Sequence, residues 1–320
     1  MDPMPQATAT TPLLLIVGPT ASGKSDLALG LAVRLGGQII SADSMQVYRG
    51  LDIGTAKPPE SAQRLVPHHL IDIAEPGQDF SMGEFVRLAR GAVEAISAQG
   101  QLPIVVGGTG LYVRALLRGI FEAPGRDERL RRRLRGIAQR RGLEALHRML
   151  ARVDPDTASR LPSSDPQRIV RALEVYILTR RPLSAHFRER GFGPELYPNV
   201  KLGIDLPRGV LYRRIDERVG RFAREGLFEE VRRLLGSGCP VEANAFKALG
   251  YREALEVLEG RLSEGEALEL IRRNTRRYAK RQLTWFRRVP GVNWLDGTLP
   301  PAELLEEGER VARPMLARLG

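Results

Sequence analysis

Cysteine is almost absent from the sequence: Cys239 is its only one in 320 residues. A single cysteine excludes an intrachain disulfide and a cysteine-rich zinc module, and it fits a reducing compartment. Long hydrophobic runs are also missing, since none approaches the roughly 20 residues of a membrane-spanning helix. The start of the chain has neither a basic segment nor an apolar core, so a secretory signal is not expected. We therefore expect a cytoplasmic protein that does not associate with membranes.

Acidic residues and lysine are few relative to arginine. Lys and Arg total 49 against 38 Asp and Glu, which gives a net charge of +11, and only five of the cations are Lys. Such an excess favours a polyanionic partner, nucleic acid above all, although genome composition can also raise the arginine content. The positive charge is concentrated at 126–141 and 272–288. We expect these segments to contact RNA, and solvated helix faces are the alternative.

Strand and helix patterns alternate in the first third of the sequence. Short apolar runs at 13–17, 38–42 and 103–106 are typical of buried parallel strands. A helix is predicted at 26–35, and the spacing of the residues at 81–84 predicts a capping box that opens another helix. Strands separated by helices predict a parallel sheet with helices on both faces.

The pattern changes near residue 124. From 124 to 183 the sequence predicts helices and no convincing strand, which indicates an insertion. The core resumes with a strand predicted at 200–206 and a long helix predicted at 210–235. The C-terminal part is predicted to be helical to its end, most clearly at 263–288. The fold class is therefore α/β with a helical insertion.

The segment 18–25, GPTASGKS, fits the phosphate-binding pattern G-x-x-x-x-G-K-[ST]. Its glycines allow successive N–H groups to point into one nest, and the following helix adds its positive end. Lys24 supplies a charge for the outer phosphates, and the Ser25 hydroxyl can bind Mg²⁺. The predicted phosphate-binding residues are Gly18, Pro19, Thr20, Ala21, Ser22, Gly23, Lys24 and Ser25, joined by Arg214 and Arg218 from one face of the 210–235 helix.

Two further observations bear on the chemistry. The strand at 103–106 ends in Gly-Gly-Thr-Gly and lacks the Asp that usually positions Mg²⁺ in ATP-hydrolysing enzymes, which leaves open a diphosphate leaving group. Asp43 directly follows the strand at 38–42, and ligands of open α/β sheets bind at the carboxyl ends of strands. Asp43 is therefore expected near the phosphate loop, where it could accept a proton. A turn or N-cap role is the alternative for Asp43.

Six blocks of the sequence resemble the bacterial tRNA dimethylallyltransferases. They are GPTASGKS (18–25), DSMQVYRGLDIGTAKP (43–58), VVGGTGLY (105–112), DPQRIVRALEVY (165–176), ALGYRE (248–253) and TRRYAKRQLTWFR (275–287). The blocks keep the order of that family over nearly the whole chain, so the resemblance is specific. It implies a P-loop NTPase-like parallel-sheet core, at 1–123 and 184–320, and a helical insertion domain that binds tRNA, at 124–183.

The resemblance also implies an activity: transfer of a dimethylallyl group from dimethylallyl diphosphate to N6 of the adenosine 3′ to the anticodon, position 37 of tRNA. By position, Asp43 matches the general base, Lys24 a diphosphate ligand, Thr20 a residue near the reacting centre and Thr109 a position beside the reaction channel. Mg²⁺ is the expected cofactor, the anticodon stem-loop the expected partner, and a monomer the expected state. The expected tRNA-binding residues are Asp43, Ser44, Met45, Gln46, Gln167, Arg168, Ile169, Val170, Arg171, Lys247, Ala248, Leu249, Gly250, Tyr251 and Arg252, with Arg131 added from the arginine-rich segment.

Three other functions remain open at the level of the residues alone. A P-loop small-molecule kinase would use Asp43 to hold an acceptor hydroxyl. An adenylate isopentenyltransferase would act on free AMP or ATP, but such an enzyme is not expected to need a large basic insertion. A non-enzymatic RNA-binding protein would use the P-loop as a switch.

Overall fold

The computed structural model describes residues 12–120, 124–190 and 193–318. The chain divides into two compact units. One, here called the core unit, combines the chain up to Leu117 with the part from Glu195 onward, and the other, the helical unit, spans Arg118–Pro194. The helical unit is therefore broader at both ends than the expected insertion at 124–183.

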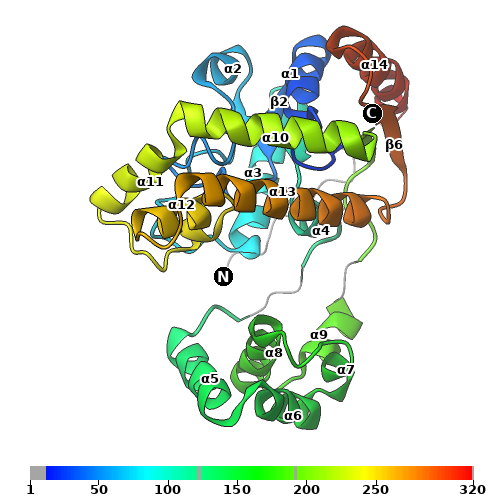
Figure 1. The fold of residues 1–320 in the computed structure, drawn as a ribbon. Coiled ribbons are helices and arrows are strands. Elements are labelled where there is room, and N and C mark those ends of the chain that lie inside the picture. Colours follow the sequence, from blue (N-terminus) through cyan, green and yellow to red (C-terminus); the bar gives the residue numbers. More distant parts are fainter. Residues whose placement is uncertain (1–11, 121–123, 191–192, 319–320) are drawn as a thin grey trace. The chain divides into compact units, whose positions relative to one another are not determined.

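Within the described residues, the core unit contains a six-stranded sheet in the order β3-β2-β4-β1-β5-β6, and every pairing is parallel (Figure 1). Val17 at the end of β1 pairs with Gly107 of β4 and Gly203 of β5. The segments that follow these central strands therefore leave the sheet at one edge. The strands are β1 (Leu13–Val17), β2 (Gly37–Ser41), β3 (His68–His69), β4 (Leu102–Gly107), β5 (Asn199–Asp205) and β6 (Val292–Asp296).

Helices make up most of the rest of the chain. None of those in the described residues is long and apolar enough to cross a membrane. In the core unit they are α1 (Lys24–Leu35), α2 (Glu60–Leu65), α3 (Met82–Ala98), α4 (Gly110–Arg118), α10 (Arg208–Glu225), α11 (Leu227–Gly236), α12 (Tyr251–Leu258), α13 (Glu264–Phe286) and α14 (Pro301–Ala317), with a 3₁₀ turn at Asn244–Lys247. In the helical unit they are α5 (Glu128–Arg141), α6 (Leu143–Val153), α7 (Pro155–Ala158), α8 (Pro166–Thr179) and α9 (Leu183–Arg190).

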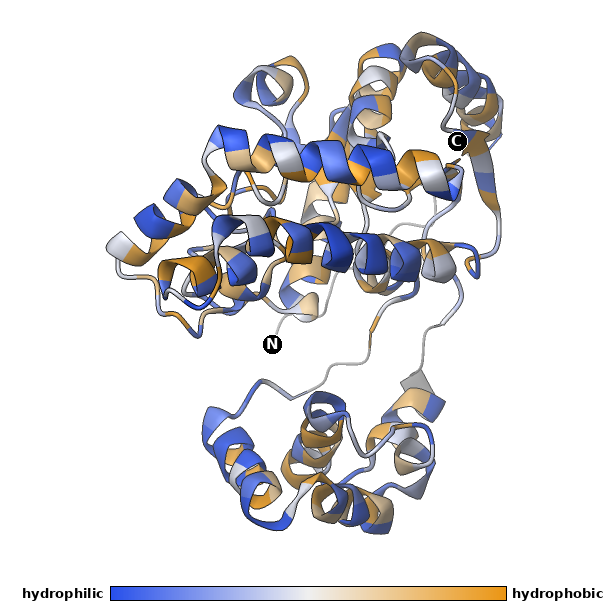
Figure 2. Ribbon diagram, viewed as in Figure 1, coloured by the Kyte–Doolittle hydropathy of each residue, from blue (hydrophilic) through white to orange (hydrophobic). Residues whose placement is uncertain are grey.

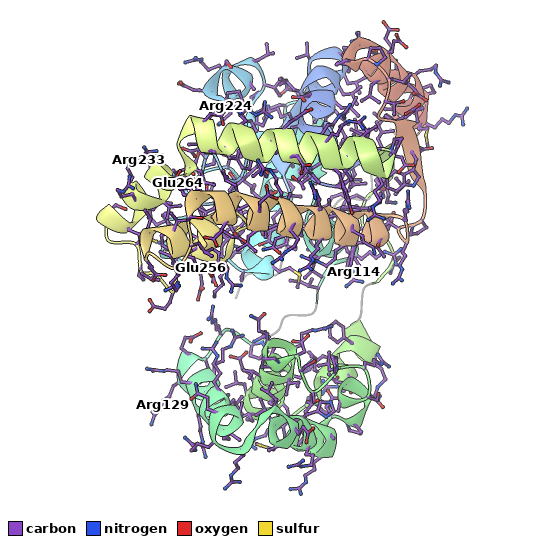
Figure 3. All side chains as sticks on the ribbon, viewed as in Figure 1. Arg114, Arg129, Arg224, Arg233, Glu256 and Glu264 are labelled. Atoms are coloured by element: carbon purple, nitrogen blue, oxygen red, sulfur yellow. The ribbon has the colours of Figure 1, made fainter. Side chains whose placement is uncertain are left out.

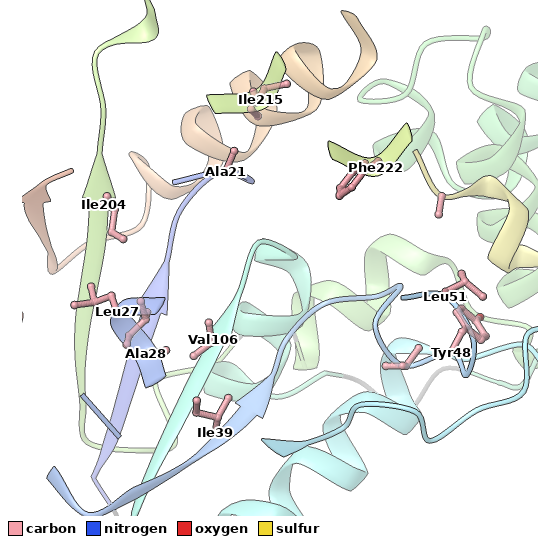
Figure 4. Packing of buried hydrophobic residues seen from close by; sticks show 14 of the residues in the cluster. Ala21, Leu27, Ala28, Ile39, Tyr48, Leu51, Val106, Ile204, Ile215 and Phe222 are labelled. Carbon is pink, nitrogen blue, oxygen red and sulfur yellow. The ribbon is translucent and has the colours of Figure 1, made fainter. Parts of the chain in front are cut away.

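Both faces of the sheet are covered, as predicted. On one face Val106 of β4 and Ile204 of β5 share a buried cluster with Leu27 of α1 (Figure 4). Leu13 and Leu15 alternate with the cluster residues of β1 and are fully buried, on the face that α3 covers. The predicted capping box opens α3: the Ser81 hydroxyl accepts the N–H of Glu84, whose carboxylate accepts the N–H of Ser81.

The C-terminal part corrects two expectations. The predicted long helix at 210–235 is divided into α10 and α11 at Gly226, whose φ of +93° ends the first helix. The chain beyond residue 288 is not wholly helical, because 292–296 forms the edge strand β6. Only Leu295 of that strand is buried, so its pattern lacks the apolar run that revealed the central strands.

The helical unit has a small core of its own, formed by α5, α6 and α8. Leu134, Leu146, Leu150 and Leu173 are buried in it. Hydrophilic positions dominate the rest of α5, and Arg129 projects from its surface (Figures 2 and 3). The described part of this unit contains no strand, as the sequence predicted.

Candidate active site

The loop from Gly18 to Ser25 connects β1 to α1 at the carboxyl edge of the sheet. Ala21 and Gly23 have left-handed backbone with φ of +64° and +95°, which turns the chain tightly around its own N–H groups. A left-handed alanine is strained by about 1–3 kcal/mol, and such strain is typical of functional sites. The loop therefore has the backbone of a phosphate nest at the N-terminus of α1.

Lys24 folds back over this loop, and its Nζ donates to the carbonyl of Pro19 at 3.3 Å. Burial and the nearby charge of Arg218 lower the pKa of Lys24 to about 8, while the charge of Asp43 opposes both. A bound anion favours the charged form of Lys24, whereas burial disfavours that form. Binding of an anion therefore raises the pKa of Lys24 again.

Helix α10 contributes arginines to the loop. Arg218 donates to the Thr20 hydroxyl at 3.3 Å, and it lines the cavity together with Arg221. Arg214 instead donates to the backbone carbonyls of Ser22 (3.3 Å) and Gly297 (3.1 Å). The structure therefore places Arg218 and Arg221 at the cavity, whereas the predicted Arg214 supports the outside of the loop.

Asp43 leaves the end of β2 beside this loop. Its Oδ1 accepts the N–H groups of Met45 (2.8 Å) and Gln46 (3.4 Å), and the side chain lines the cavity. The turn role that the sequence left open is thus present. The two N–H groups of the turn use one carboxylate oxygen of Asp43, and the second oxygen of an ionised carboxylate can accept a proton.

Thr109 lies on the other side of Asp43, in the Gly-Gly-Thr-Gly turn after β4. Its hydroxyl accepts the N–H of Ser44 at 3.3 Å, and its N–H donates to the carbonyl of Ala42 at 3.3 Å. The predicted residues Thr20, Lys24, Asp43 and Thr109 therefore gather at one edge of the sheet.

Helix α13 adds two residues that the sequence analysis did not assign to the site. Gln282 accepts the N–H of Thr20 at 2.8 Å and donates to the carbonyl of Gly108 at 3.0 Å. Tyr278, one turn before Gln282, lines the cavity. Burial and the charge of Asp43 raise the pKa of Tyr278 to about 12, so Tyr278 is a neutral phenol. Both residues lie in the block 275–287, but no spacing rule connects them to a loop so far away in sequence.

These elements surround a cavity of about 860 Å³. Its polar wall contains Lys24, Asp43 and Arg218, and its apolar wall contains Ile39 and Phe222. A volume of this size is typical of pockets for small organic ligands. The cavity can therefore hold a molecule with an anionic end and an apolar end.

Ser25 and Asp26 line the same cavity at the start of α1, where the sequence predicted Mg²⁺ at Ser25. No group of three or more His, Cys, Asp or Glu able to hold a metal ion is found in the part of the chain that the structure describes. A magnesium ion here would thus depend on phosphate oxygens as well as Ser25, which is the usual arrangement for Mg²⁺ with phosphate ligands.

The expected tRNA-binding residues of the core unit divide into two groups. Ser44, Met45, Gln46, Lys247, Ala248 and Leu249 line the cavity. The Gln46 amide is already engaged, because it accepts the Ser41 hydroxyl (2.9 Å) and donates to the carbonyls of Thr55 (3.2 Å) and Ala56 (3.3 Å). Of the others, Gly250 and Tyr251 are buried, while Arg252 is exposed.

The expected residues of the helical unit also differ in exposure. Gln167 and Arg168 are exposed at the start of α8, where Arg168 forms an ion pair with Asp165 at 2.5 Å, whereas Ile169 and Val170 are buried in the core of the unit. The side chains of Ile169 and Val170 therefore stabilise the fold and do not present themselves to RNA.

Arg131 and Arg171 both bind the buried Glu174. Arg131 makes two bonds of 2.8 Å to that carboxylate, and Arg171 makes one of 2.5 Å. Burial alone would raise the pKa of Glu174, but the bonds from Arg131, Arg171 and the Asp127 N–H lower it to about 2. The side chains of Arg131 and Arg171 thus have a structural role that the sequence analysis did not foresee.

Known proteins share this architecture. A model of the IPP transferase family matches residues 46–289, and a model of isopentenyl transferases matches residues 11–67. A tRNA dimethylallyltransferase of Geobacter metallireducens is 53% identical over 286 residues, covering 89% of this chain and 93% of the relative. One from Geobacillus thermodenitrificans is 49% identical over 294 residues, with 91% and 92% covered.

Solved structures agree with these matches. The tRNA isopentenylpyrophosphate transferase of Bacillus halodurans is 39% identical with a TM-score of 0.71, covering 97% of this chain and 98% of that one. A eukaryotic dimethylallyltransferase crystallised acting on tRNA is 27% identical with a TM-score of 0.79, covering 95% of this chain and 77% of the other. By the length and identity of these matches, the chain belongs to the IPP transferase family.

Proposed function

We propose that the protein transfers a dimethylallyl group from dimethylallyl diphosphate to N6 of the adenosine that follows the anticodon of tRNA. One observation supports this proposal above others: the phosphate nest and the Asp43 carboxylate open into the same cavity from neighbouring parts of the sheet. The relatives named above carry out this class of transfer on tRNA, as their names state.

The nucleophile needs a proton acceptor. The lone pair of the adenine N6 is delocalised into the ring, so N6 is a weak nucleophile until it loses a proton. In the proposed reaction N6 attacks the allylic carbon, the bond from that carbon to the diphosphate oxygen breaks, and the N6 proton passes to Asp43. Thr109 holds the turn beside Asp43 by accepting the N–H of Ser44, so it orients the base side of the cavity.

The leaving group needs positive charge. The allylic carbon becomes cationic while negative charge grows on the departing diphosphate, so stabilising that charge is the main catalytic demand. The N–H groups of the loop, Lys24 and the guanidinium of Arg218 supply this stabilisation. Mg²⁺ held by the diphosphate and Ser25 would neutralise further charge when bound.

The proposed RNA partner is the anticodon stem-loop. A loop adenine can leave its stack at a cost of a few kcal/mol, which makes entry into the cavity feasible. Arg273, Arg277 and Lys280 are exposed along α13, whose inner residues form the cavity wall. These charges and the exposed arginines of α5 would bind phosphates. A single chain supplies every group named, so we propose a monomer acting on cytoplasmic tRNA.

One assay separates this function from the alternatives. The protein is incubated with Mg²⁺ and labelled dimethylallyl diphosphate, together with bulk tRNA, AMP or no acceptor. We expect label in tRNA alone. Label in AMP would indicate an adenylate isopentenyltransferase. No label in any sample, together with phosphoryl transfer in a parallel incubation with ATP, would indicate a kinase.

A further inference from the structure

The two halves of the site arise from different parts of the sheet. The diphosphate loop follows β1, whereas Asp43 follows β2 and the Gly108–Thr109 turn follows β4. The transfer needs both substrates aligned, because productive attack places the reacting atoms about 3–3.5 Å apart. Some element must therefore fix the distance between the loop and the turn.

A continuous chain of hydrogen bonds joins the halves, and Gln282 is at its centre. On the phosphate side, Arg218 bonds to the hydroxyl of Thr20, whose N–H bonds to Gln282. On the base side, Gln282 donates to the carbonyl of Gly108, and the hydroxyl of the adjoining Thr109 accepts the N–H of Ser44, next to Asp43. One amide thus connects the loop at 18–25, which would hold the diphosphate, with the turn beside Asp43.

The turn beside the amide leaves no room for a side chain at Gly108. A Cβ atom at Gly108 would lie 2.1 Å from Nε2 of Gln282, so this position accepts only glycine while the amide is in place. Gln282 is also 6% exposed and lines the cavity. Its neighbour on the same buried face of α13, Phe286, is 1% exposed and has no part in the cavity wall.

We propose that Gln282 is a positioning residue for the transfer: its amide sets the spacing between the diphosphate loop and the turn that carries Thr109. This inference rests on the proposed function. A residue with this role affects how the two substrates are aligned when both are bound. Each substrate should therefore still bind by itself when the amide is removed, while the transfer between them slows.

The first test compares Gln282→Met with Phe286→Leu. Methionine retains the length of glutamine but cannot donate to Gly108, and its sulfur is only a weak acceptor for the Thr20 N–H. The control disturbs the same buried helix face without touching the chain of bonds. Single-turnover rates are measured with both substrates saturating, together with the dissociation constant of each substrate alone. We expect Gln282→Met to be about 10- to 100-fold slower with each dissociation constant within about threefold of wild type, and Phe286→Leu to retain the wild-type rate.

The second test uses Gln282→Glu across pH. A carboxylate can accept the Thr20 N–H but cannot donate to Gly108, whereas a protonated carboxyl does both. The variant rate is divided by the wild-type rate at each pH, which removes the titration of groups common to both proteins. We expect this ratio to rise as the pH falls. The surrounding charged or titratable groups shared by both proteins are Lys24, Asp43, Arg218, Tyr278 and Arg281.

The outcomes distinguish the inference from the proposed function. A wild-type protein that does not prenylate tRNA would contradict the function itself. If wild type is active, a saturated Gln282→Met rate equal to that of Phe286→Leu would overturn the positioning role, and so would a ratio for Gln282→Glu that stays flat with pH. A slow Gln282→Met and a rising ratio together would support it.

Discussion

Single residues in the cavity act on one another through charge. Lys24 lies between the cation of Arg218 and the carboxylate of Asp43, and its pKa of about 8 reflects burial first, then the arginine, with the aspartate opposing them. Lys24 is therefore mostly charged below pH 8 and mostly neutral above it. A bound diphosphate favours the charged form, so binding above pH 8 must be accompanied by proton uptake.

Proton uptake by Lys24 predicts how the affinity for dimethylallyl diphosphate depends on pH. Its affinity for the free enzyme should decline as the pH rises above about 8, and calorimetry in buffers of different ionisation enthalpy should detect the proton uptake. Lys24→Met should bind more weakly and lose the pH dependence in this range. An equal pH dependence in the variant would assign the titration to another group.

Asp43 has two roles that substitution can separate. The amide introduced by Asp43→Asn keeps an oxygen for the Met45 N–H but cannot take a proton, whereas Asp43→Ala loses both functions. We expect Asp43→Asn to fold normally, bind tRNA normally and turn over roughly 10²–10⁴-fold more slowly. Near-wild-type single-turnover rates in Asp43→Asn, together with a slow Asp43→Ala, would limit Asp43 to its turn.

Some site residues could be identified from the sequence and others could not. The difference is whether a residue belongs to a local sequence pattern or meets the site only through the fold. The phosphate loop and Asp43 were predictable, because the loop is a contiguous motif and strand ends meet at one edge of a parallel sheet. Gln282 was not, since it meets Thr20 across 262 positions of sequence. Arg214 and Arg218 share a helix face, yet only the fold shows that Arg214 bonds to loop carbonyls while Arg218 lines the cavity.

Secondary-structure elements are tied to one another by buried polar groups as well as by apolar packing. Glu230 of α11 is 3% exposed. It accepts the N–H groups of Asp52 (3.2 Å) and Ile53 (3.0 Å) and the hydroxyl of Tyr251 (2.5 Å). One carboxylate thus links the segment after Asp43 to α12.

We predict that Glu230→Ala lowers the free energy of unfolding by about 2–4 kcal/mol, because two N–H groups and a hydroxyl lose a charged acceptor. The exposed neighbour Glu229 provides a matched control on the same helix, and Glu229→Ala should change stability by less than about 0.5 kcal/mol. Urea denaturation measures both. Equal effects of the two substitutions would show that Glu230 has no special part in the fold.

Helix α5 carries arginines with two different tasks. Arg131 binds buried Glu174, whereas Arg132, Arg133 and Arg135 are exposed. The arginine-rich pattern predicted the helix but could not separate these tasks, because the partner of Arg131 lies on α8. A test of RNA binding by α5 must therefore leave Arg131 intact.

Replacing Arg132, Arg133 and Arg135 with Gln should weaken tRNA binding and flatten its salt dependence by up to about three units of log–log slope, at roughly 0.7–0.9 per phosphate contact. The affinity for dimethylallyl diphosphate should stay unchanged. Arg131→Gln is the contrasting variant, which should lower the stability of the helical unit. An unchanged slope in the triple variant would make α5 a solvated surface and assign RNA binding to α13.

The whole molecule combines a parallel-sheet core with a helical unit inserted between α4 and β5. The alternation of strands and helices predicted this organisation, most clearly at β1, which is a continuous apolar run. Edge strand β6 and the break at Gly226 were not predicted. A strand with one buried residue has little periodicity, and one glycine inside an amphipathic pattern does not reveal whether the helix ends there.

The proposed reaction brings dimethylallyl diphosphate and one tRNA adenosine into a single cavity. Its most direct test is nucleoside and fragment analysis of tRNA after incubation with the protein, Mg²⁺ and labelled dimethylallyl diphosphate. We predict one labelled nucleoside, N6-isopentenyladenosine, at the position 3′ to the anticodon, and no label in a tRNA with guanosine at that position. Label on another base, or equal labelling of the guanosine-substituted tRNA, would contradict the account.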